Sequence, residues 1–141
     1  MRTRNEWKMA KSILFVCVEN ACRSQMAEGF LEHFGKGRIE AYSAGSRPAD
    51  QVNPLAVKAM RERGIDISRQ RPKGFDELPQ FEFNYVITMG CKDACPSIPT
   101  KARIEWDISD PKGKSLETFR EVRDEIGGRV EELVRVIFQD S

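Results

Sequence analysis

A short apolar run that leads directly into a cysteine constrains the fold of this chain more than any other feature. Residues 13–16 follow one another without a polar side chain, as in a central strand of a parallel sheet that is covered on both faces. Cys17 ends this run, and after a short loop a helical pattern extends over residues 24–34. A buried strand, a loop and a helix in this order predict an α/β fold.

The rest of the sequence continues to alternate between strand and helix patterns. Met26, Phe30 and Phe34 recur at helical spacing within the first helix. Further strands are predicted over residues 38–43, 85–89 and 102–106, and further helices over residues 54–63 and 115–137, with Ser24 and Ser115 as N-caps. We therefore predict a single α/β domain over residues 12–141, with a four-stranded parallel sheet and helices on both faces. A flexible extension of residues 1–11 precedes it.

Composition and charge exclude several classes of protein. Hydrophobic residues make up 40% of the 141 residues and charged residues 32%, which is typical of a globular chain and not of a disordered one. The formal net charge of +1 offers no field for nucleic acid or an anionic membrane, so we expect neither as a partner. The apolar stretch 13–18 is too short for a signal peptide or a membrane span. We therefore expect a cytoplasmic protein, and a monomer.

The four cysteines are expected to be catalytic or metal-binding rather than disulfide-bonded, because the cytosol is reducing. They stand at positions 17, 22, 91 and 95. Zinc is one alternative, but the spacings Cys-x4-Cys and Cys-x3-Cys differ from the usual Cys-x2-Cys arrangement. We predict no metal and no cofactor.

The loop that begins at Cys17 carries the strongest chemical signal. Five residues separate Cys17 from Arg23, enough for a loop that curls around a tetrahedral anion with its backbone N–H groups pointing inward. The planar guanidinium of Arg23 can hold two oxygens of such an anion at once. The same positive potential is expected to lower the pKa of Cys17 from about 8.5, which would supply a thiolate nucleophile at neutral pH.

The spacing Cys-x5-Arg also has a simpler interpretation. A cysteine at the end of a buried strand is often a small core residue and has no chemical role. The context favours function, because an apolar strand precedes the loop and the pair Arg23-Ser24 opens an amphipathic helix.

Longer stretches of the sequence resemble the arsenate reductases that are related to low-molecular-weight tyrosine phosphatases. The likeness is carried, in order along the chain, by Val16-Cys17, Asn20-Ala21-Cys22-Arg23-Ser24-Gln25-Met26-Ala27-Glu28-Gly29, Tyr42-Ser43-Ala44-Gly45, Val52-Asn53-Pro54, Gly64-Ile65-Asp66-Ile67-Ser68, Val86-Ile87-Thr88, Asp110-Pro111 and Phe119-Arg120-Glu121-Val122-Arg123-Asp124-Glu125-Ile126. It extends over about residues 12–138. In the phosphatases the Arg-Ser pair is usually followed by proline, whereas Gln25-Met26-Ala27-Glu28 is similar to the reductases.

The resemblance implies a role for each residue of the site. Cys17 would be the nucleophile, Arg23 would clamp the oxyanion, and Asp110 would be the general acid that protonates the departing oxygen. Asn20 and Ser24 would hold the loop in shape and hydrogen-bond the thiolate. The residues that bind the substrate would be Val18, Glu19, Asn20, Ala21, Cys22, Arg23 and Ser24. Cys22 has no nucleophilic role in the family and is interpreted as structural.

Without the resemblance, Asp110 has a simpler interpretation as well. It stands directly before Pro111, and an aspartate in that position commonly forms an Asx-turn. A turn residue would need no contact with the predicted oxyanion site.

Two positions depart from the family pattern. Glu19 stands where the phosphatase loop commonly has glycine, which places an acid near an anion site. Some relatives bind potassium behind the loop, and Asn20, Glu28 and Ser43 match that site. Lys73, however, stands where an acid is expected. A built-in ammonium could therefore replace the ion, and we predict no potassium.

Cys91 and Cys95 favour reduction over simple hydrolysis. Reduction of arsenate requires two electrons, which two further thiols can supply. Because these cysteines follow a strand that is expected to lie close to the first, both should start near Cys17. Two unrelated loop cysteines are the simpler alternative, and their spacing is shorter than in the best-known thioredoxin-coupled members of the family.

We therefore predict an arsenate reductase. Cys17 attacks arsenate, Cys91 and Cys95 form a thiol–disulfide relay, and thioredoxin or another thiol reductant restores the two thiols. Two alternatives stay open. One is a phosphatase acting on phosphotyrosine or phosphoarginine, and the other is a non-enzymatic redox sensor or anion-binding module.

Overall fold

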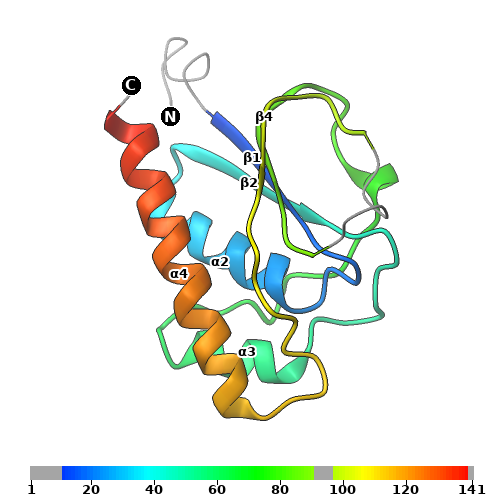
Figure 1. The fold of residues 1–141 in the computed structure, drawn as a ribbon, viewed down its shortest axis with the longest axis vertical. Helices are drawn as coiled ribbons and strands as arrows, with labels where there is room; N and C mark the ends of the chain where they lie inside the picture. The colour runs from blue at the N-terminus through cyan, green and yellow to red at the C-terminus, as the bar shows by residue number, and fades with distance from the viewer. Residues whose placement is uncertain (1–10, 91–96, 140–141) are drawn as a thin grey trace.

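Four parallel strands form the centre of the computed structural model, which describes residues 11–90 and 97–139 (Figure 1). The strands are β1 (Lys11–Val16), β2 (Ile39–Ala44), β3 (Phe83–Thr88) and β4 (Thr100–Glu105). Their order across the sheet is β2-β1-β3-β4, and every neighbouring pair is parallel. The predicted four-stranded parallel sheet is therefore confirmed, with the apolar run after Ser12 in a central strand.

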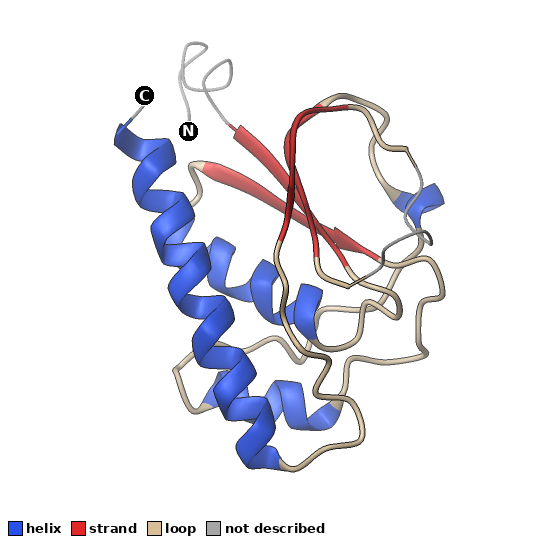
Figure 2. Ribbon diagram, viewed as in Figure 1, coloured by secondary structure: helices blue, strands red, loops and turns tan. Residues whose placement is uncertain are grey.

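The α-helices of the described ranges share one core on one face of this sheet (Figure 2). They are α2 (Arg23–Gly35), α3 (Pro54–Arg61) and α4 (Leu116–Gln139). Their apolar side chains meet Ile13, Phe15 and Ile87 of the sheet. None of these helices is long and apolar enough to cross a membrane.

The opposite face of the sheet has less helical cover than predicted. Leu14 and Val86 pack there against Phe75 and Leu78. These two residues belong to the 3₁₀ turn η1 (Phe75–Glu77) and to its C-cap. Within the described ranges, η1 is the helical element that covers this face of the sheet. The surrounding sequence contains two prolines and a glycine, which do not favour a longer helix.

The element boundaries lie close to the predicted ones. β1 begins at Lys11, one residue earlier than expected, and the rest of the predicted extension lies outside the described residues. Asn53 caps α3 by accepting a hydrogen bond from the amide of Leu55 (2.9 Å). Ser115 caps α4 by accepting one from the amide of Thr118 (3.3 Å), as predicted.

The strand order determines where a site can form. β1 lies between β2 and β3, so the strand order reverses at β1, and ligands gather at the carboxyl ends of strands at such a point. The chain leaves β1 and β3 side by side there, since the amide of Met89 donates to the carbonyl of Val16 (2.8 Å). The fold therefore brings Cys17 and the chain before residue 91 to the same edge.

Candidate active site

The loop 18–22 is held from outside by the segment 47–53. Three amides of that segment donate to three carbonyl groups of the loop: Arg47 to Val18 (2.9 Å), Ala49 to Glu19 (3.0 Å) and Asn53 to Ala21 (2.9 Å). In a trans peptide the C=O and the following N–H point in opposite directions, so outward carbonyls turn the next amides inward. These loop amides have no acceptor in the described part of the chain, and they form a nest for an anion.

Asn20 holds the loop from inside the protein. It is fully buried and has a φ of 52°, a left-handed conformation that asparagine adopts more readily than most residues. Its side-chain oxygen accepts hydrogen bonds from the amide of Lys73 (2.9 Å) and from the side chain of Gln25 (3.0 Å). Its side-chain nitrogen donates to Ser24 Oγ (2.7 Å). All three contacts fix the curvature of the loop.

Gly45 permits the loop to lie directly against the end of β2. A Cβ atom at this position would lie 2.5 Å from the carbonyl oxygen of Val18 and 2.7 Å from that of Cys17. Both atoms belong to the backbone and cannot move aside cheaply. A side chain at position 45 would therefore displace the loop.

The thiol of Cys17 lies at the base of the loop and bonds to Ser24, with 2.8 Å between Sγ and Oγ. Because Ser24 Oγ already accepts a hydrogen bond from Asn20, its own proton can be donated to the sulfur, where it would stabilise negative charge. The prediction of Ser24 as an N-cap is therefore wrong. α2 begins at Arg23 with no side-chain cap, which leaves its first amides available to an anion.

Arg23 is buried and reaches across to the loop after β4. Its Nη1 donates to the carbonyl of Ile108 (3.0 Å), and its Nη2 lies 3.5 Å from Asp110 Oδ2. Its Nε is buried and has no partner in the described structure. Unpaired buried donors are rare, and this N–H is available to donate a hydrogen bond to an oxyanion.

Asp110 takes part in two interactions. Its interpretation as a turn residue is therefore compatible with its interpretation as a general acid. Its Oδ1 accepts a hydrogen bond from the amide of Lys112 (3.0 Å), which is the Asx-turn expected before a proline. Its Oδ2 faces the guanidinium of Arg23. The side chain is 51% exposed, so it can exchange protons with solvent. The turn holds the carboxyl group at the oxyanion site.

Cys22 has surroundings that suppress ionisation. Its side chain is buried, and Asp110 and Cys17 add negative charge nearby. Burial first, then these charges, raises the pKa of Cys22 from 9.0 to about 12, although Arg23 acts in the opposite direction. Cys22 is therefore a neutral thiol at neutral pH, which agrees with its interpretation as structural.

The ammonium group of Lys73 lies behind the loop, among the residues that match a potassium site in some relatives. Its Nζ is 3.4 Å from Ser43 Oγ and 3.7 Å from Glu28 Oε1, and it donates to the carbonyl of Arg71 (3.3 Å). Ser43 Oγ also donates a short hydrogen bond to Glu28. The positive charge at this place is thus part of the chain.

Cys91 and Cys95 lie outside the described residues, so the structure does not place them. Gly90, the residue before Cys91, is described and has a φ of 81°. A Cβ atom there would lie 2.5 Å from Nη1 of Arg23. Glycine therefore allows the chain to pass against the guanidinium immediately before the first of the two cysteines.

Three residues of the site were not found from the sequence. Gln25 donates to the carbonyls of Asn20 and Arg71, and Gln70 donates to Gln25 Oε1 (2.7 Å). Lys112 forms an ion pair with Glu19. Each contact joins residues far apart in the chain or depends on loop curvature, so no local spacing indicates it.

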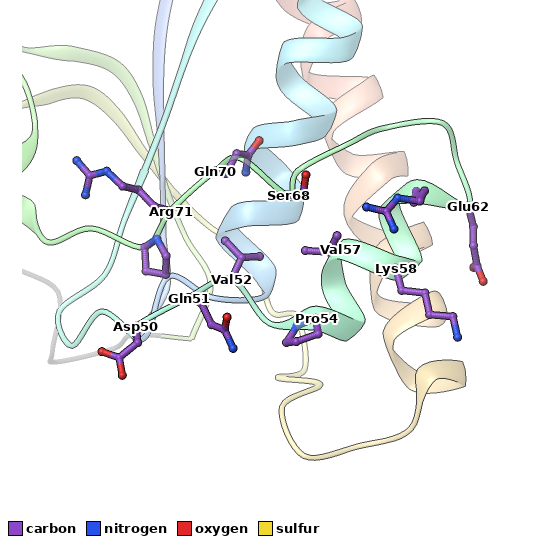
Figure 3. Close-up of a pocket in the computed structure, with 12 residues that line it drawn as sticks. Asp50, Gln51, Val52, Pro54, Val57, Lys58, Glu62, Ser68, Gln70 and Arg71 are labelled. Carbon is purple, nitrogen blue, oxygen red and sulfur yellow. The ribbon is translucent and has the colours of Figure 1, made fainter.

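The cavity at Cys17 is small and lies at the mouth of the loop. It has a volume of about 10 Å³ and is lined by Cys17, Glu19, Ala21, Cys22, Arg23, Asp110 and Lys112. A larger hollow of about 770 Å³ opens between residues 50–54, helix α3 and residues 68–72 (Figure 3), but the nucleophile and Arg23 do not line it. The predicted catalytic residues Cys17, Arg23 and Asp110 therefore line the smaller cavity. Residues 11–90 and 97–139 contain no cluster of three or more His, Cys, Asp or Glu side chains that could hold a metal.

Residues 12–141 match the family model of low molecular weight phosphotyrosine protein phosphatases. The chain belongs to this family. The match covers the whole of the predicted domain and leaves out the predicted extension.

Relatives of this phosphatase-family chain include proteins named arsenate reductase. It is 40% identical over 130 residues to a glutaredoxin arsenate reductase from Synechocystis sp., a match that covers 90% of this chain and 98% of the relative. It is 44% identical over 120 residues to an arsenate reductase from Staphylococcus aureus, covering 82% and 90%.

Solved structures agree with the sequence relatives. An arsenate reductase in a phosphate-binding state superposes with a TM-score of 0.80 at 38% identity, covering 90% of this chain and 98% of that one. A thioredoxin-dependent arsenate reductase from Corynebacterium glutamicum superposes with a TM-score of 0.78 at 37% identity, covering 94% of this chain and 64% of that one. The predicted resemblance to the reductases of this family is therefore confirmed.

Lys73→Met should destabilise the protein, because it leaves the buried carboxylate of Glu28 without a cation. Breaking a buried ion pair costs about 3–5 kcal/mol, and because Lys73 is partly exposed we expect a loss of about 2 kcal/mol in the free energy of unfolding. Urea denaturation at pH 7 measures this loss. Lys58→Met, at an exposed position of α3, is the control and should change stability by less than about 0.5 kcal/mol. Equal effects of the two substitutions would contradict the role of Lys73 as the cation that pairs with Glu28.

Cys22 should resist alkylation at neutral pH. Only the thiolate reacts, and a pKa of about 12 leaves roughly one thiol in ten thousand ionised at pH 8. Iodoacetamide at pH 8 should therefore modify Cys17 long before Cys22, as measured by mass spectrometry of peptides cleaved after Glu19, which separates the two cysteines. The urea-unfolded chain is the control, in which both should react at similar rates. Comparable rates in the folded protein would show that Cys22 ionises freely.

Proposed function

We propose that this chain is an arsenate reductase, which reduces arsenate to arsenite through a thiolate at Cys17. The observation that carries the proposal is the arrangement at the ends of β1 and β3. There a thiol faces a hydroxyl donor, a nest of free amides and the unpartnered Nε of Arg23. Relatives at 40% and 44% identity that bear the name arsenate reductase support the choice of arsenate.

Arsenate binding would use only groups that are already in position. The inward amides of Glu19, Asn20 and Cys22 and the guanidinium of Arg23 would bind the oxygens of the anion. Arg23 would keep its hydrogen bond to the carbonyl of Ile108, which fixes the plane of the guanidinium. Donors that do not have to reorganise stabilise developing charge most effectively.

In the first chemical step, Cys17 attacks arsenic and an oxygen departs. A sulfur–arsenic bond forms as an arsenic–oxygen bond breaks, and protonated Asp110 gives the leaving oxygen its proton, so that water departs. The distance of 3.5 Å between Asp110 and Arg23 supports this role, since an oxyanion held by Arg23 lies within reach of the carboxyl group.

In the next steps, Cys91 and Cys95 supply the electrons. Cys91 attacks the sulfur of Cys17, the sulfur–arsenic bond breaks, and its electron pair stays on arsenic, which leaves as arsenite. Cys95 then attacks Cys91, which releases the Cys17 thiolate and leaves a Cys91–Cys95 disulfide. The closeness of Gly90 to Arg23 supports this order, because Gly90 directly precedes Cys91 in the sequence.

The disulfide would be reduced by thioredoxin. A pair of thiols within one chain yields an internal disulfide, which suits a dithiol reductant, and one structural neighbour is thioredoxin-dependent. Another thiol system is the alternative, since one relative is named a glutaredoxin arsenate reductase. The near-neutral net charge supports the proposal that neither nucleic acid nor an anionic membrane is a partner. Action as a cytoplasmic monomer stays a prediction.

Phosphate-ester hydrolysis is a second candidate function. The family is named for phosphotyrosine phosphatases, and Cys17, Arg23 and Asp110 are the three groups such hydrolysis requires. After the same attack by Cys17, water would resolve the intermediate in place of Cys91. The two functions therefore share the first step and differ in the second.

Asp110→Asn should slow hydrolysis of an alkyl phosphate far more than that of p-nitrophenyl phosphate. Asparagine can still accept the hydrogen bond from the amide of Lys112, so the turn is retained while the proton is lost. General acid catalysis contributes about 10²–10⁴-fold and matters most for poor leaving groups. We expect about 100-fold loss for the alkyl ester and less than about fivefold for the aryl ester. Equal losses would reduce Asp110 to a turn residue.

Cys95→Ser should release one arsenite per enzyme and then stop as a Cys17–Cys91 disulfide. Cys91→Ser should stop before arsenite is released, and Cys17→Ser should lose both reduction and ester hydrolysis. Mass spectrometry of the species trapped after a single turnover measures these outcomes.

The double variant Cys91→Ser, Cys95→Ser is the control for the first step, because it should keep weak phosphate-ester hydrolysis. Undiminished multiple-turnover reduction by this variant, with thioredoxin as the sole reductant, would rule out the internal relay.

A further inference from the structure

An ion pair forms an exposed part of the lining of the cavity at Cys17. Glu19 belongs to the oxyanion loop and Lys112 to the turn that holds Asp110, and Lys112 Nζ lies 2.5 Å from Glu19 Oε2. Both side chains line the same small cavity as Cys17 and Arg23. The pair therefore joins the side of the site that carries the nucleophile to the side that carries the acid.

We propose that the Glu19–Lys112 ion pair determines specificity, because it closes over a free oxyanion and excludes one that carries an organic substituent. The proposal rests on the oxyanion site of the proposed function. It concerns which anions that site accepts, and not how arsenic is reduced.

The available space supports this role. A cavity of about 10 Å³ is barely enough for one water molecule, which needs about 10–15 Å³. An anion must therefore displace part of the lining, and the Glu19–Lys112 pair is a part that is free to move. It can do so readily, since Glu19 and Lys112 are 35% and 58% exposed and exposed ion pairs are weak. It can close again over arsenate or phosphate, but a substituent that leads outward through the mouth keeps it open.

The charges of Glu19 and Lys112 also support this role. A carboxylate beside an anion site repels the anion unless a cation neutralises it. The charge of Glu19 is felt inside the loop, where it contributes to the raised pKa of Cys22. Lys112 offsets this charge, and its own raised pKa arises first from the hydrogen bond to Glu19. Without Lys112, Glu19 would therefore weaken binding of every anion.

The test compares two anions with the same head group, inorganic phosphate and phenylphosphonate. Each protects Cys17 from iodoacetamide when it occupies the site, and the concentration for half-protection is read from the Cys17 peptide by mass spectrometry. The proteins are the wild type, Glu19→Gln, Lys112→Met, Lys112→Arg and the double variant Glu19→Gln, Lys112→Met. Glu132→Gln is the matched control, because it breaks an exposed ion pair of the same length on α4.

In Glu19→Gln, the half-protecting concentration of phenylphosphonate should fall about fivefold, while that of phosphate changes less than about twofold. In Lys112→Met, phosphate should bind about fivefold more weakly, because Glu19 is left unpaired. The double variant should behave as Glu19→Gln alone, which is the non-additivity expected of residues in contact. Lys112→Arg and Glu132→Gln should resemble the wild type.

Other outcomes distinguish a failure of the ion-pair proposal from a failure of the proposed oxyanion site. Equal changes for both anions in Glu19→Gln, or additive effects in the double variant, would overturn the role of the ion pair and leave the reductase proposal intact. Failure of phosphate and arsenate to protect Cys17 in the wild type would overturn the oxyanion site, and both proposals with it.

Discussion

The three hydrogen bonds between the segment 47–53 and the loop 18–22 are the interactions on which the site depends. They turn the loop carbonyls outward, and the amides face inward only for that reason. Asn20 fixes the same curvature from the other side through its left-handed backbone and its buried side chain. Parallel N–H dipoles repel one another, so this arrangement persists because the surrounding contacts over-determine it. Gly45 also contributes, because a Cβ atom at this position would displace the loop.

The same scaffold gives two cysteines of one loop different surroundings. Cys17 lies at the strand end, where Ser24 can donate a hydrogen bond to its sulfur. Cys22 lies at the start of α2, buried and facing the charges of Asp110 and Cys17, and its pKa rises to about 12. Both residues are free thiols with almost no exposed surface, so accessibility does not separate them. Hydrogen bonding and local charge therefore distinguish the surroundings of the two cysteines, although Cys17 and Cys22 are only five residues apart.

Much of this architecture could be predicted from the sequence, because local patterns determine it. The apolar run 13–16 and the period of α4 identify their elements, and the end of a parallel sheet is where loops after β1, β3 and β4 must meet. Ser24 was misassigned because a serine before a helix usually caps it, and here the thiol and Asn20 use its hydroxyl. The pair of Glu19 and Lys112 joins residues 93 positions apart, and no spacing rule reaches that far. The sparse helical cover over Leu14 could not be predicted either, because it depends on tertiary packing.

A family named for phosphatases can contain reductases because the oxyanion site decides only the first step. In the proposed mechanism Cys17, Arg23 and Asp110 would serve either reaction, so the outcome would depend on what reaches the Cys17 sulfur next. In this chain β3 ends beside β1, and Gly90, at a φ of 81°, packs against the guanidinium of Arg23. A side chain at position 90 would meet Nη1 of Arg23, and a φ of 81° is strained for any residue that carries a Cβ. Gly90 therefore matters to the proposed relay, since a thiol would compete with water only if it started close to the intermediate.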